Sequence, residues 1–240
     1  KKRGSKGARI FYTRRPEMET AEEKLSFLAR NPLRGLVMEE VAPDKASNWL
    51  NLTSNDFEAF LPLASKGAKQ GKRGEKAIFK LFSLGVVTNR DDWVIADTDI
   101  EVCERVKALI DAYNSEVDGD ASGLAIKWTR AVKKDLAKKT KYTFDPDQIV
   151  DHQYRPYAKK RLYYSRQLNE MQYLQPQIFP TGISNRAIMI SGAPASKPFQ
   201  ALAVDVVPSL DILEKTQSLP LYRVEGGSRF DNITDWALKQ

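Results

Sequence analysis

The sequence has few of the residues that build disulfides and metal centres. Its 240 residues include one cysteine, Cys103, and one histidine, His152. A lone cysteine excludes an internal disulfide and suits a reducing compartment, so we expect a cytoplasmic protein. Because the usual zinc ligands are missing, we predict no metal site. His152 stands in "VDHQY" without a second histidine, and we expect it to be a structural hydrogen-bonding residue rather than a catalytic base.

Signals for membrane insertion and for common enzyme classes are also missing. No apolar run approaches the ~18 residues of a membrane span. No secretory signal is present, and the start at "KKRGSKG" without a methionine leads us to expect a piece of a longer chain. The phosphate-binding GxxxxGK(S/T) loop, the GxGxxG dinucleotide motif and the GxSxG nucleophile motif do not occur. We therefore predict no catalytic residue and no cofactor in this chain.

The adjacent acids of "TNRDDW", Asp91 and Asp92, are the nearest approach to a magnesium site. Neighbouring side chains on a strand point to opposite faces, so we expect these acids to cap a turn or to pair with Arg90. A stand-alone metal-dependent nuclease that uses Asp91, Asp92 and Glu101 is the enzymatic alternative.

Hydrophobic periodicity predicts both helices and strands. The strongest helix covers 98–117, where Val102, Val106, Leu109 and Ile110 recur at helical spacing, with Cys103 on or beside their face. Further helices or helical turns are expected over 17–31, capped by Thr20, and over 54–63, 129–141 and 231–240, the last capped by Asp231 or Asn232. Strands are expected over 8–14, 35–43, 77–89, 186–191 and 201–207. The pattern predicts an α+β fold with mixed, mostly antiparallel sheets and packed helices.

The clearest break in the pattern is the stretch 65–76, "SKGAKQGKRGEK". It holds three glycines and five cations, with one acid. This composition predicts a flexible basic linker or loop between a first part, 1–64, and a second part, 77–240. A phosphate-contacting loop is the alternative.

Basic residues are the main signal for function. The net charge is +7 and the pI about 9.3, which suits nucleic acid or another anionic partner. Residues 127–141 contain seven cations and one acid, and a second basic cluster spans 155–166. We expect both clusters to lie on one concave surface wide enough for a double helix. The candidate phosphate-binding residues are Arg130, Lys133, Lys134, Lys138, Arg155, Lys159, Lys160 and Arg166.

Amides and tyrosines follow the second basic cluster. Asn169, Gln172, Gln175 and Gln177 are side chains of the type that pairs with adenine edges in the major groove. Tyrosines can stack on an unpaired base, but the residues around Tyr163 and Tyr164 are typical of a strand. We therefore expect these two rings to pack inside the fold.

Several stretches in order resemble the C-terminal part of Type ISP restriction-modification enzymes. They are "ARIFYTRRPEMETAEEKLSFL", "NWLN", "SLGVVTNRDDWV", "IKWTRAVKKDL", "YRPYAKKRLYYSRQLNEMQY" and "PLYRVEGGSRFDNITDWAL". The resemblance spans nearly the whole chain. Enzymes of this family are single bacterial polypeptides with a nuclease, a helicase-like ATPase motor, an adenine-N6 methyltransferase and a target recognition domain.

The resemblance implies a division of the chain. Residues 1–64 would be the end of the methyltransferase core and a connector, and 77–240 the recognition domain for double-stranded DNA. The methylating NPPY motif is absent from this sequence, so S-adenosylmethionine, ATP and Mg would serve other domains of the parent polypeptide. A protein-docking module is a further alternative, and RNA binding a weaker one.

The resemblance also directs the search for residues that read bases. Family members read different targets, so the motifs that identify the family are expected to build the scaffold or hold phosphates. Base readers should lie between the motifs, in 167–177, 181–186 or 191–199. Asn89 and Arg90 are candidates outside these stretches. The candidate base-reading residues are Asn169, Gln172, Gln175, Gln177, Arg186, Asn89 and Arg90.

Overall fold

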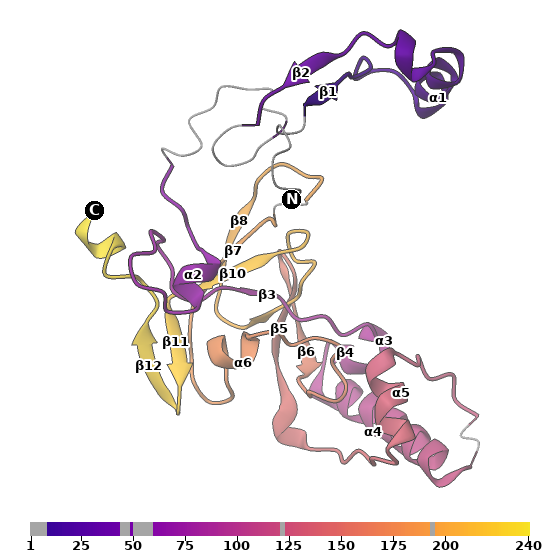
Figure 1. The fold of residues 1–240 in the computed structure, drawn as a ribbon. Coiled ribbons are helices and arrows are strands. Elements are labelled where there is room, and N and C mark those ends of the chain that lie inside the picture. Colours follow the sequence, from indigo (N-terminus) through magenta and orange to yellow (C-terminus); the bar gives the residue numbers. More distant parts are fainter. Residues whose placement is uncertain (1–8, 44–48, 50–59, 121–122, 193–194) are drawn as a thin grey trace, which may run out of the picture. The chain divides into compact units, whose positions relative to one another are not determined.

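The computed structural model describes residues 9–43, 49, 60–120, 123–192 and 195–240. The chain divides into two units, 1–60 and 61–240 (Figure 1). In the first unit, strand β1 (Ile10–Tyr12) pairs antiparallel with β2 (Glu39–Val41), and helix α1 (Ala21–Arg30) and a 3₁₀ turn, η1 (Leu33–Gly35), lie between them in sequence.

Thr20 caps helix α1 as the sequence predicts. Its hydroxyl accepts a hydrogen bond from the Glu23 amide at 3.3 Å, and the Glu23 carboxylate accepts one from the Thr20 amide at 2.7 Å. This reciprocal pair satisfies two backbone donors that a helix N-terminus otherwise leaves free. The expected segment 54–63 lies mostly outside the described residues.

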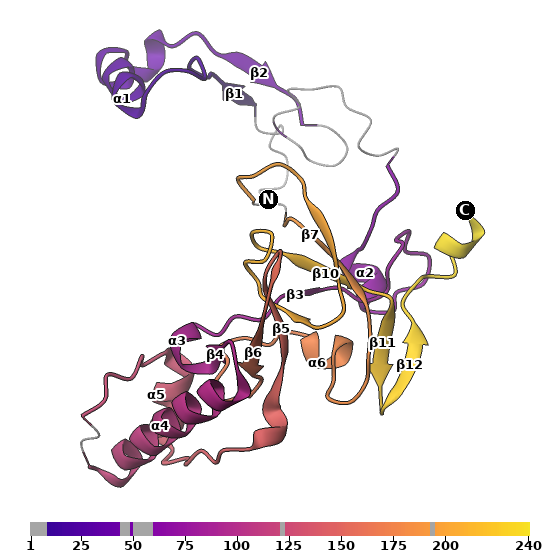
Figure 2. The same cartoon turned by 180° about the vertical axis from the view of Figure 1, so that it is seen from behind.

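The described residues of the second unit form two four-stranded sheets and a hairpin (Figures 1 and 2). The first sheet has the order β3 (Ser83–Leu84), β10 (Gln217–Pro220), β7 (Ala187–Ile190), β8 (Ala201–Val204). The second has the order β4 (Ile95–Ala96), β6 (Ala158–Tyr163), β5 (Ile149–Arg155), β9 (Val207–Pro208). The hairpin joins β11 (Tyr222–Glu225) and β12 (Ser228–Asp231). Only the β5–β9 pairing is parallel among these described strands.

The helices of this unit vary greatly in length. They are α2 (Lys66–Lys69), α3 (Asp91–Val94), α4 (Asp99–Asp118), α5 (Arg130–Ala137) and α6 (Gln175–Ile178), with 3₁₀ turns η3 (Pro146–Gln148) and η4 (Ala237–Lys239). Helices α4 and α5 lie side by side at the end of the unit that also carries β4 (Figures 1 and 2). Helices with mostly antiparallel sheets confirm the α+β prediction.

Helix α4 is the best-predicted element. Val102, Val106, Leu109 and Ile110 are all buried in the core, and Cys103 is half-buried beside them. The helix ends at Gly119, whose φ of 95° lies in the left-handed region that favours glycine. Its apolar face therefore anchors the helix on the core.

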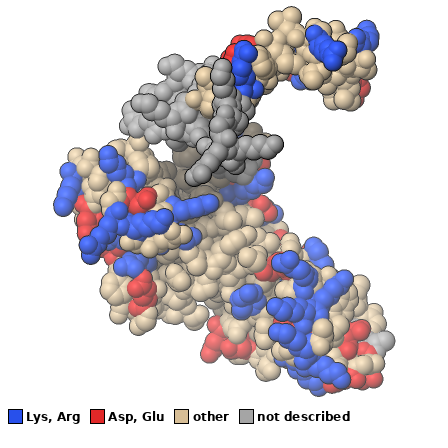
Figure 3. All heavy atoms as spheres, in the orientation of Figure 1, with Lys and Arg blue, Asp and Glu red and all other residues tan. Residues whose placement is uncertain are grey.

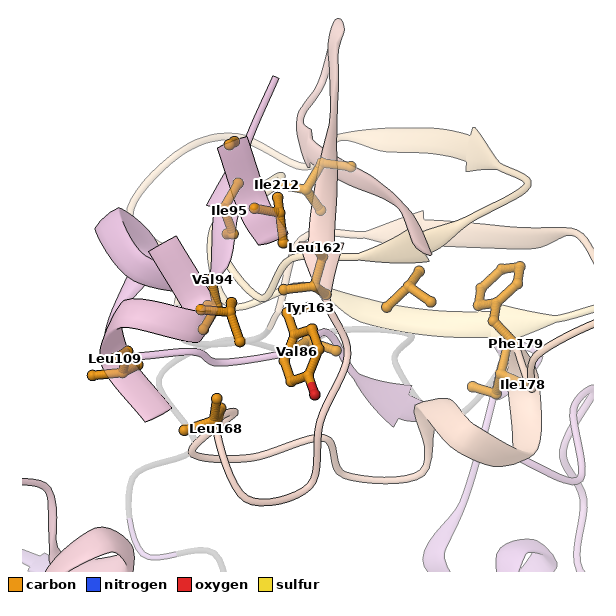
Figure 4. Packing of buried hydrophobic residues seen from close by; sticks show 14 of the residues in the cluster. Val86, Val94, Ile95, Leu109, Leu162, Tyr163, Leu168, Ile178, Phe179 and Ile212 are labelled. Carbon is orange, nitrogen blue, oxygen red and sulfur yellow. The ribbon is translucent and has the colours of Figure 1, made fainter. Parts of the chain in front are cut away.

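The core joins the second sheet to the helices and to the first sheet. Figure 4 shows Leu162 and Tyr163 of β6 near Val94 and Ile95, with Ile178 from α6 farther along the same cluster. Tyr163 is buried, and its hydroxyl accepts a hydrogen bond from the Asp145 amide at 3.0 Å. Tyr164 packs against this core too. The expectation that both rings pack inside the fold is confirmed.

The prediction of a C-terminal helix over 231–240 is wrong. Asp231 ends strand β12, and only the short turn η4 is helical. Asn232 is buried and uses its amide to bind Leu81 N and O at 2.6 and 2.9 Å and Pro220 O at 2.7 Å. An amide committed to distant backbone groups cannot cap a helix, so the chain continues extended past the expected start. The strand expected over 77–89 is also reduced, to β3.

His152 is a structural residue, as predicted. It is 1% exposed, and its Nδ1 lies 2.8 Å from Val207 O, across the parallel β5–β9 pairing. Burial lowers the pKa of His152 to about 4, because an imidazolium would lose its hydration there. The folded chain therefore keeps this ring neutral.

This burial predicts a specific pH dependence of stability. The folded-state pKa lies below the unfolded value of about 6.5, so the contribution is complete above pH 6.5 and is lost as pH falls towards the folded value, because the unfolded chain takes up a proton. Between about pH 7 and about pH 5.5 the free energy of unfolding should fall by about 1 kcal/mol from this group. Urea unfolding at both pH values measures it.

The matched variant is His152→Gln, which removes the only histidine of the chain. Its unfolding free energy should change about 1 kcal/mol less over the same pH interval, whatever its absolute stability. An identical change in both proteins would show that His152 titrates normally in the folded chain.

Candidate nucleic-acid interface

A buried arginine organises the region around α5. Arg90 is 5% exposed, and its guanidinium donates to Leu168 O at 2.7 Å and to the Thr129 hydroxyl at 2.8 Å. The Glu170 carboxylate lies 3.9 Å away. Burial lowers the pKa of Arg90, and the charge of Glu170 opposes this shift. Since Thr129 directly precedes α5, Arg90 joins the 86–92 loop, the start of α5 and the 168–170 segment.

Four cations line a hollow beside this arginine, which we call the α5 hollow. It has a volume of about 630 Å³ and is lined by Arg130, Lys134, Lys138 and Arg166, with Asp135 and Glu170 among its other residues. Asp135 accepts a hydrogen bond from Tyr142, and Glu170 faces Arg90. None of the four cations forms an ion pair with an acid in the described part of the chain. The lining therefore has four cations against two acids and carries a net positive charge.

Helix α5 presents these cations because its other face is apolar. Val132 is buried and Leu136 packs against the core, so positions 130, 134 and 138 fall on the outer side. Lys133 is exposed on the same helix but does not line the hollow. Figure 3 shows Lys and Arg gathered over α5, and a second gathering over α2.

A second hollow, the Asn89 hollow, includes Arg90 in its lining. It has a volume of about 500 Å³, and its lining includes the 86–93 loop, Lys127, Arg155 and 209–211. Asn89 is exposed with a φ of 56°, in the left-handed region that asparagine tolerates better than most residues. Its side chain forms no hydrogen bond with the described residues, so the amide is free for a ligand.

The acids of "NRDDW" belong to the fold at this site. Asp91 and Asp92 begin helix α3, where acids favour the N-terminus. The Asp91 carboxylate accepts hydrogen bonds from the Thr88 hydroxyl and, at 3.0 Å, from the Tyr154 hydroxyl. Asp91 thus bonds these two groups rather than Arg90.

The remaining cations of the second basic cluster are paired on the sheet. Lys159 lies 2.8 Å from Asp205 and Lys160 3.0 Å from Asp97, and Arg161 bonds Asp99. The structure thus places Arg166 with the α5 cations and Arg155 at the Asn89 hollow. Lys159 and Lys160 line neither hollow.

Three of the candidate base-reading amides are buried. Asn169 is 1% and Gln175 0% exposed, and Gln172 is also buried. Asn169 donates to Tyr163 O at 3.1 Å, Gln172 to Asn169 Oδ1 at 3.2 Å, and Gln175 to Leu84 O at 2.8 Å. Asn169 and Gln175 thus donate to carbonyls of strands β6 and β3, and Gln172 donates to the side chain of Asn169. With Arg90, they hold the protein together and do not face a ligand.

The exposed base-reading candidates are Asn89, Gln177 and Arg186. Gln177 lines a third hollow, of about 530 Å³, which the 65–76 stretch also borders through Lys69, Lys72 and Arg73. Arg186 precedes β7 and lies near Asp205, whose pKa is lowered mainly by the Lys159 hydrogen bond and in part by the charge of Arg186.

Sequence reasoning missed Lys127 as a site residue. It was counted in the basic run 127–141, but it precedes α5 and therefore falls outside the helical-face pattern that selected the other cations. Lys127 lines the Asn89 hollow together with residues 88–91, and no local pattern indicates that proximity.

Two further observations limit the chemistry of the described residues. They contain no group of three or more His, Cys, Asp or Glu side chains that could hold a metal ion. Among them, no helix combines the length and apolar character needed to cross a membrane.

Several solved structures have a similar fold. The chain is similar to DrdV in a cryo-EM structure of a DrdV–DNA complex, with 42% identity and a TM-score of 0.78 over 96% of this chain and 24% of that one. It is also similar to a nuclease-deletion mutant of the Type ISP restriction-modification enzyme LlaGI in complex with a DNA substrate mimic, with 28% identity and a TM-score of 0.74 over 97% of this chain and 20% of that one.

A third neighbour shares the fold. It is the ATP-dependent Type ISP restriction-modification enzyme LlaBIII bound to DNA, with 24% identity and a TM-score of 0.70 over 84% of this chain and 14% of that one. The chain therefore spans a quarter or less of each of these proteins. The comparison with curated proteins finds no match.

A family model confirms the resemblance seen in the sequence. The model of the Type ISP C-terminal specificity domain matches residues 77–240, which is more than half of the chain. The chain belongs to the Type ISP family, and residues 77–240 form its C-terminal specificity domain.

Proposed function

We propose that this chain recognises a target sequence in double-stranded DNA, and that the α5 hollow and the Asn89 hollow form its contact surface. The observation that carries the proposal is the set of four cations that share the α5 hollow without an acidic partner among the described residues. DrdV and LlaGI, both similar over nearly the whole chain, were solved with DNA or a DNA mimic.

The row of cations on α5 suits a phosphate backbone. Arg130, Lys134 and Lys138 are four residues apart, so they succeed one another at about 6 Å along the helix axis. Each cation that neutralises a phosphate releases counterions, which makes the affinity strong at low salt and independent of sequence. Arg166 adds a charge from a separate segment. These residues orient the duplex and do not choose its sequence.

Asn89 and Arg186 are the base readers we favour. The exposed Asn89 lines a hollow together with the cations Lys127 and Arg155 and the acids Asp91, Asp92 and Asp211. A free amide can pair with adenine through two hydrogen bonds. Arg186 is exposed and can donate two hydrogen bonds to guanine. Gln177 would contact DNA only if the duplex also reaches the third hollow.

The recognition domain would direct reactions performed by other domains of a longer cytoplasmic polypeptide. The neighbours are at least four times as long as the part that this chain matches. We infer that a methyltransferase domain using S-adenosylmethionine and a motor and nuclease using ATP and Mg are its covalent partners, and that this chain catalyses no reaction by itself.

Neither rival function has comparable support. The nuclease alternative needs Glu101 at a metal, yet its carboxylate accepts from the Thr98 amide at 3.2 Å in the capping box of α4. A protein-docking module would not need four cations without acidic partners in one hollow.

Lys134→Ala is expected to weaken binding to every duplex alike. The plot of log affinity against log salt should become shallower by about one unit, because one phosphate contact is lost. Fluorescence anisotropy with a labelled duplex over a salt series measures both quantities.

Lys141→Ala is the matched control for this experiment. Lys141 is exposed too, but it pairs with Asp118 at 2.8 Å and lies outside the α5 hollow. Its removal should leave the salt slope unchanged. Equal slopes for Lys134→Ala and the unmodified chain would refute the assignment of the α5 hollow.

Asn89→Gly is expected to change sequence preference and to keep phosphate binding. Glycine retains the φ of 56° without strain, so only the amide is lost. Selection from a randomised duplex pool should show one base position relaxed, equivalent to ~1–3 kcal/mol of lost discrimination there. The same preferences in both selections would exclude Asn89 as a base reader.

A further inference from the structure

The turn between β5 and β6 carries an aromatic ring in open solvent. Pro156 and Tyr157 form this two-residue turn, and Tyr157 is 98% exposed. Its neighbours Tyr154, Tyr163 and Tyr164 all pack against the core. A large ring that contributes nothing to the core but stands at the tip of a two-stranded ribbon is available for a partner.

Hydrogen bonds fix the backbone of the tip that carries the ring. Gln153 is buried and donates its side-chain amide to Arg155 O at 2.9 Å and Pro156 O at 3.3 Å. The Gln153 carbonyl accepts from the Ser209 amide at 3.0 Å, which ties the hairpin to the segment after β9. Pro156 fixes its own φ. Binding through Tyr157 would therefore cost little backbone entropy.

The charge beside the ring indicates the kind of partner. The Arg155 guanidinium stacks on Tyr154, with its centre 4.0 Å from that ring, and donates to Tyr154 O at 2.9 Å. It forms no ion pair with any described acid, and it lines the Asn89 hollow. An exposed ring two residues from an unpaired cation suits a polyanion that carries flat bases.

We propose that Tyr157 inserts against a base step of duplex DNA and stacks on a base, while Arg155 contacts a flanking phosphate. This inference rests on the proposed function and deepens it. A two-stranded ribbon fits the major groove, and base stacking on an aromatic ring is tolerant of sequence. Because the step must be partly unstacked, steps that deform easily would be favoured at this position. Tyr157 would thus add specificity without reading a base edge.

The test compares Tyr157→Ala with Tyr157→Phe, which keeps the ring. The preferred duplex from the randomised pool is labelled with 2-aminopurine at successive positions, and fluorescence and Kd are measured for each protein. The unmodified chain and Tyr157→Phe should both change the 2-aminopurine fluorescence when the label stands at one particular base step. Tyr157→Ala should abolish that change and raise Kd on the order of tenfold. Since Tyr157 is exposed, both variants should keep the thermal midpoint of the unmodified chain.

A second duplex separates insertion from a simple surface contact. A mismatch at the affected step lowers the cost of unstacking, so the unmodified chain should bind it more tightly than the matched duplex, and Tyr157→Ala should gain less. The insertion is refuted if Tyr157→Ala has the same Kd and the same fluorescence change as the unmodified chain. It is also refuted if Tyr157→Ala loses affinity while the unmodified chain changes the fluorescence at no particular base step. Lys134→Ala then decides separately whether the α5 hollow binds DNA at all.

Discussion

The buried guanidinium of Arg90 is the contact on which the candidate interface depends. Taking a cation out of water is costly, and here the cost is offset by hydrogen bonds to Leu168 O and Thr129 and by the charge of Glu170. The Thr129 hydroxyl receives Arg90 and makes no cap bond to α5. One internal cation thus holds the residue that precedes α5, the helix that carries most of the exposed cations of the α5 hollow.

Local sequence patterns predicted the elements that depend on nearest neighbours. Helix α4 follows from Val102, Val106, Leu109 and Ile110, because their spacing produces an apolar face whatever they pack against. The Thr20 cap depends only on Thr20 and Glu23, which are three residues apart in the sequence. The structural role of His152 could also be predicted from the sequence, because a lone histidine in a strand-like segment has no partner with which to build a metal site.

Long-range contacts decided what the sequence could not predict. Asn232 has the sequence context of a helix cap, yet it binds Leu81 across 151 residues. Asn169 and Gln175 stand in an amide-rich stretch that predicts base reading, yet they donate hydrogen bonds to Tyr163 O and Leu84 O. The sequence does not distinguish a side-chain amide that is free to bind a ligand from one that is hydrogen-bonded within the fold. They differ only in whether the fold brings an unpaired backbone group within reach.

The same reasoning applies to charge, and it explains why the site is smaller than the basic clusters. Lys159 and Lys160 of β6 form ion pairs with Asp205, between β8 and β9, and with Asp97, directly after β4. Exposed pairs of this kind stabilise the fold by only ~0–1 kcal/mol each, but they lower the local positive potential. The α5 cations form no such pair among the described residues, and of the two acids that line the hollow, Asp135 accepts a hydrogen bond from Tyr142 and Glu170 faces Arg90. The charge of a hollow therefore depends on where the fold places its acids as much as on its lysines and arginines.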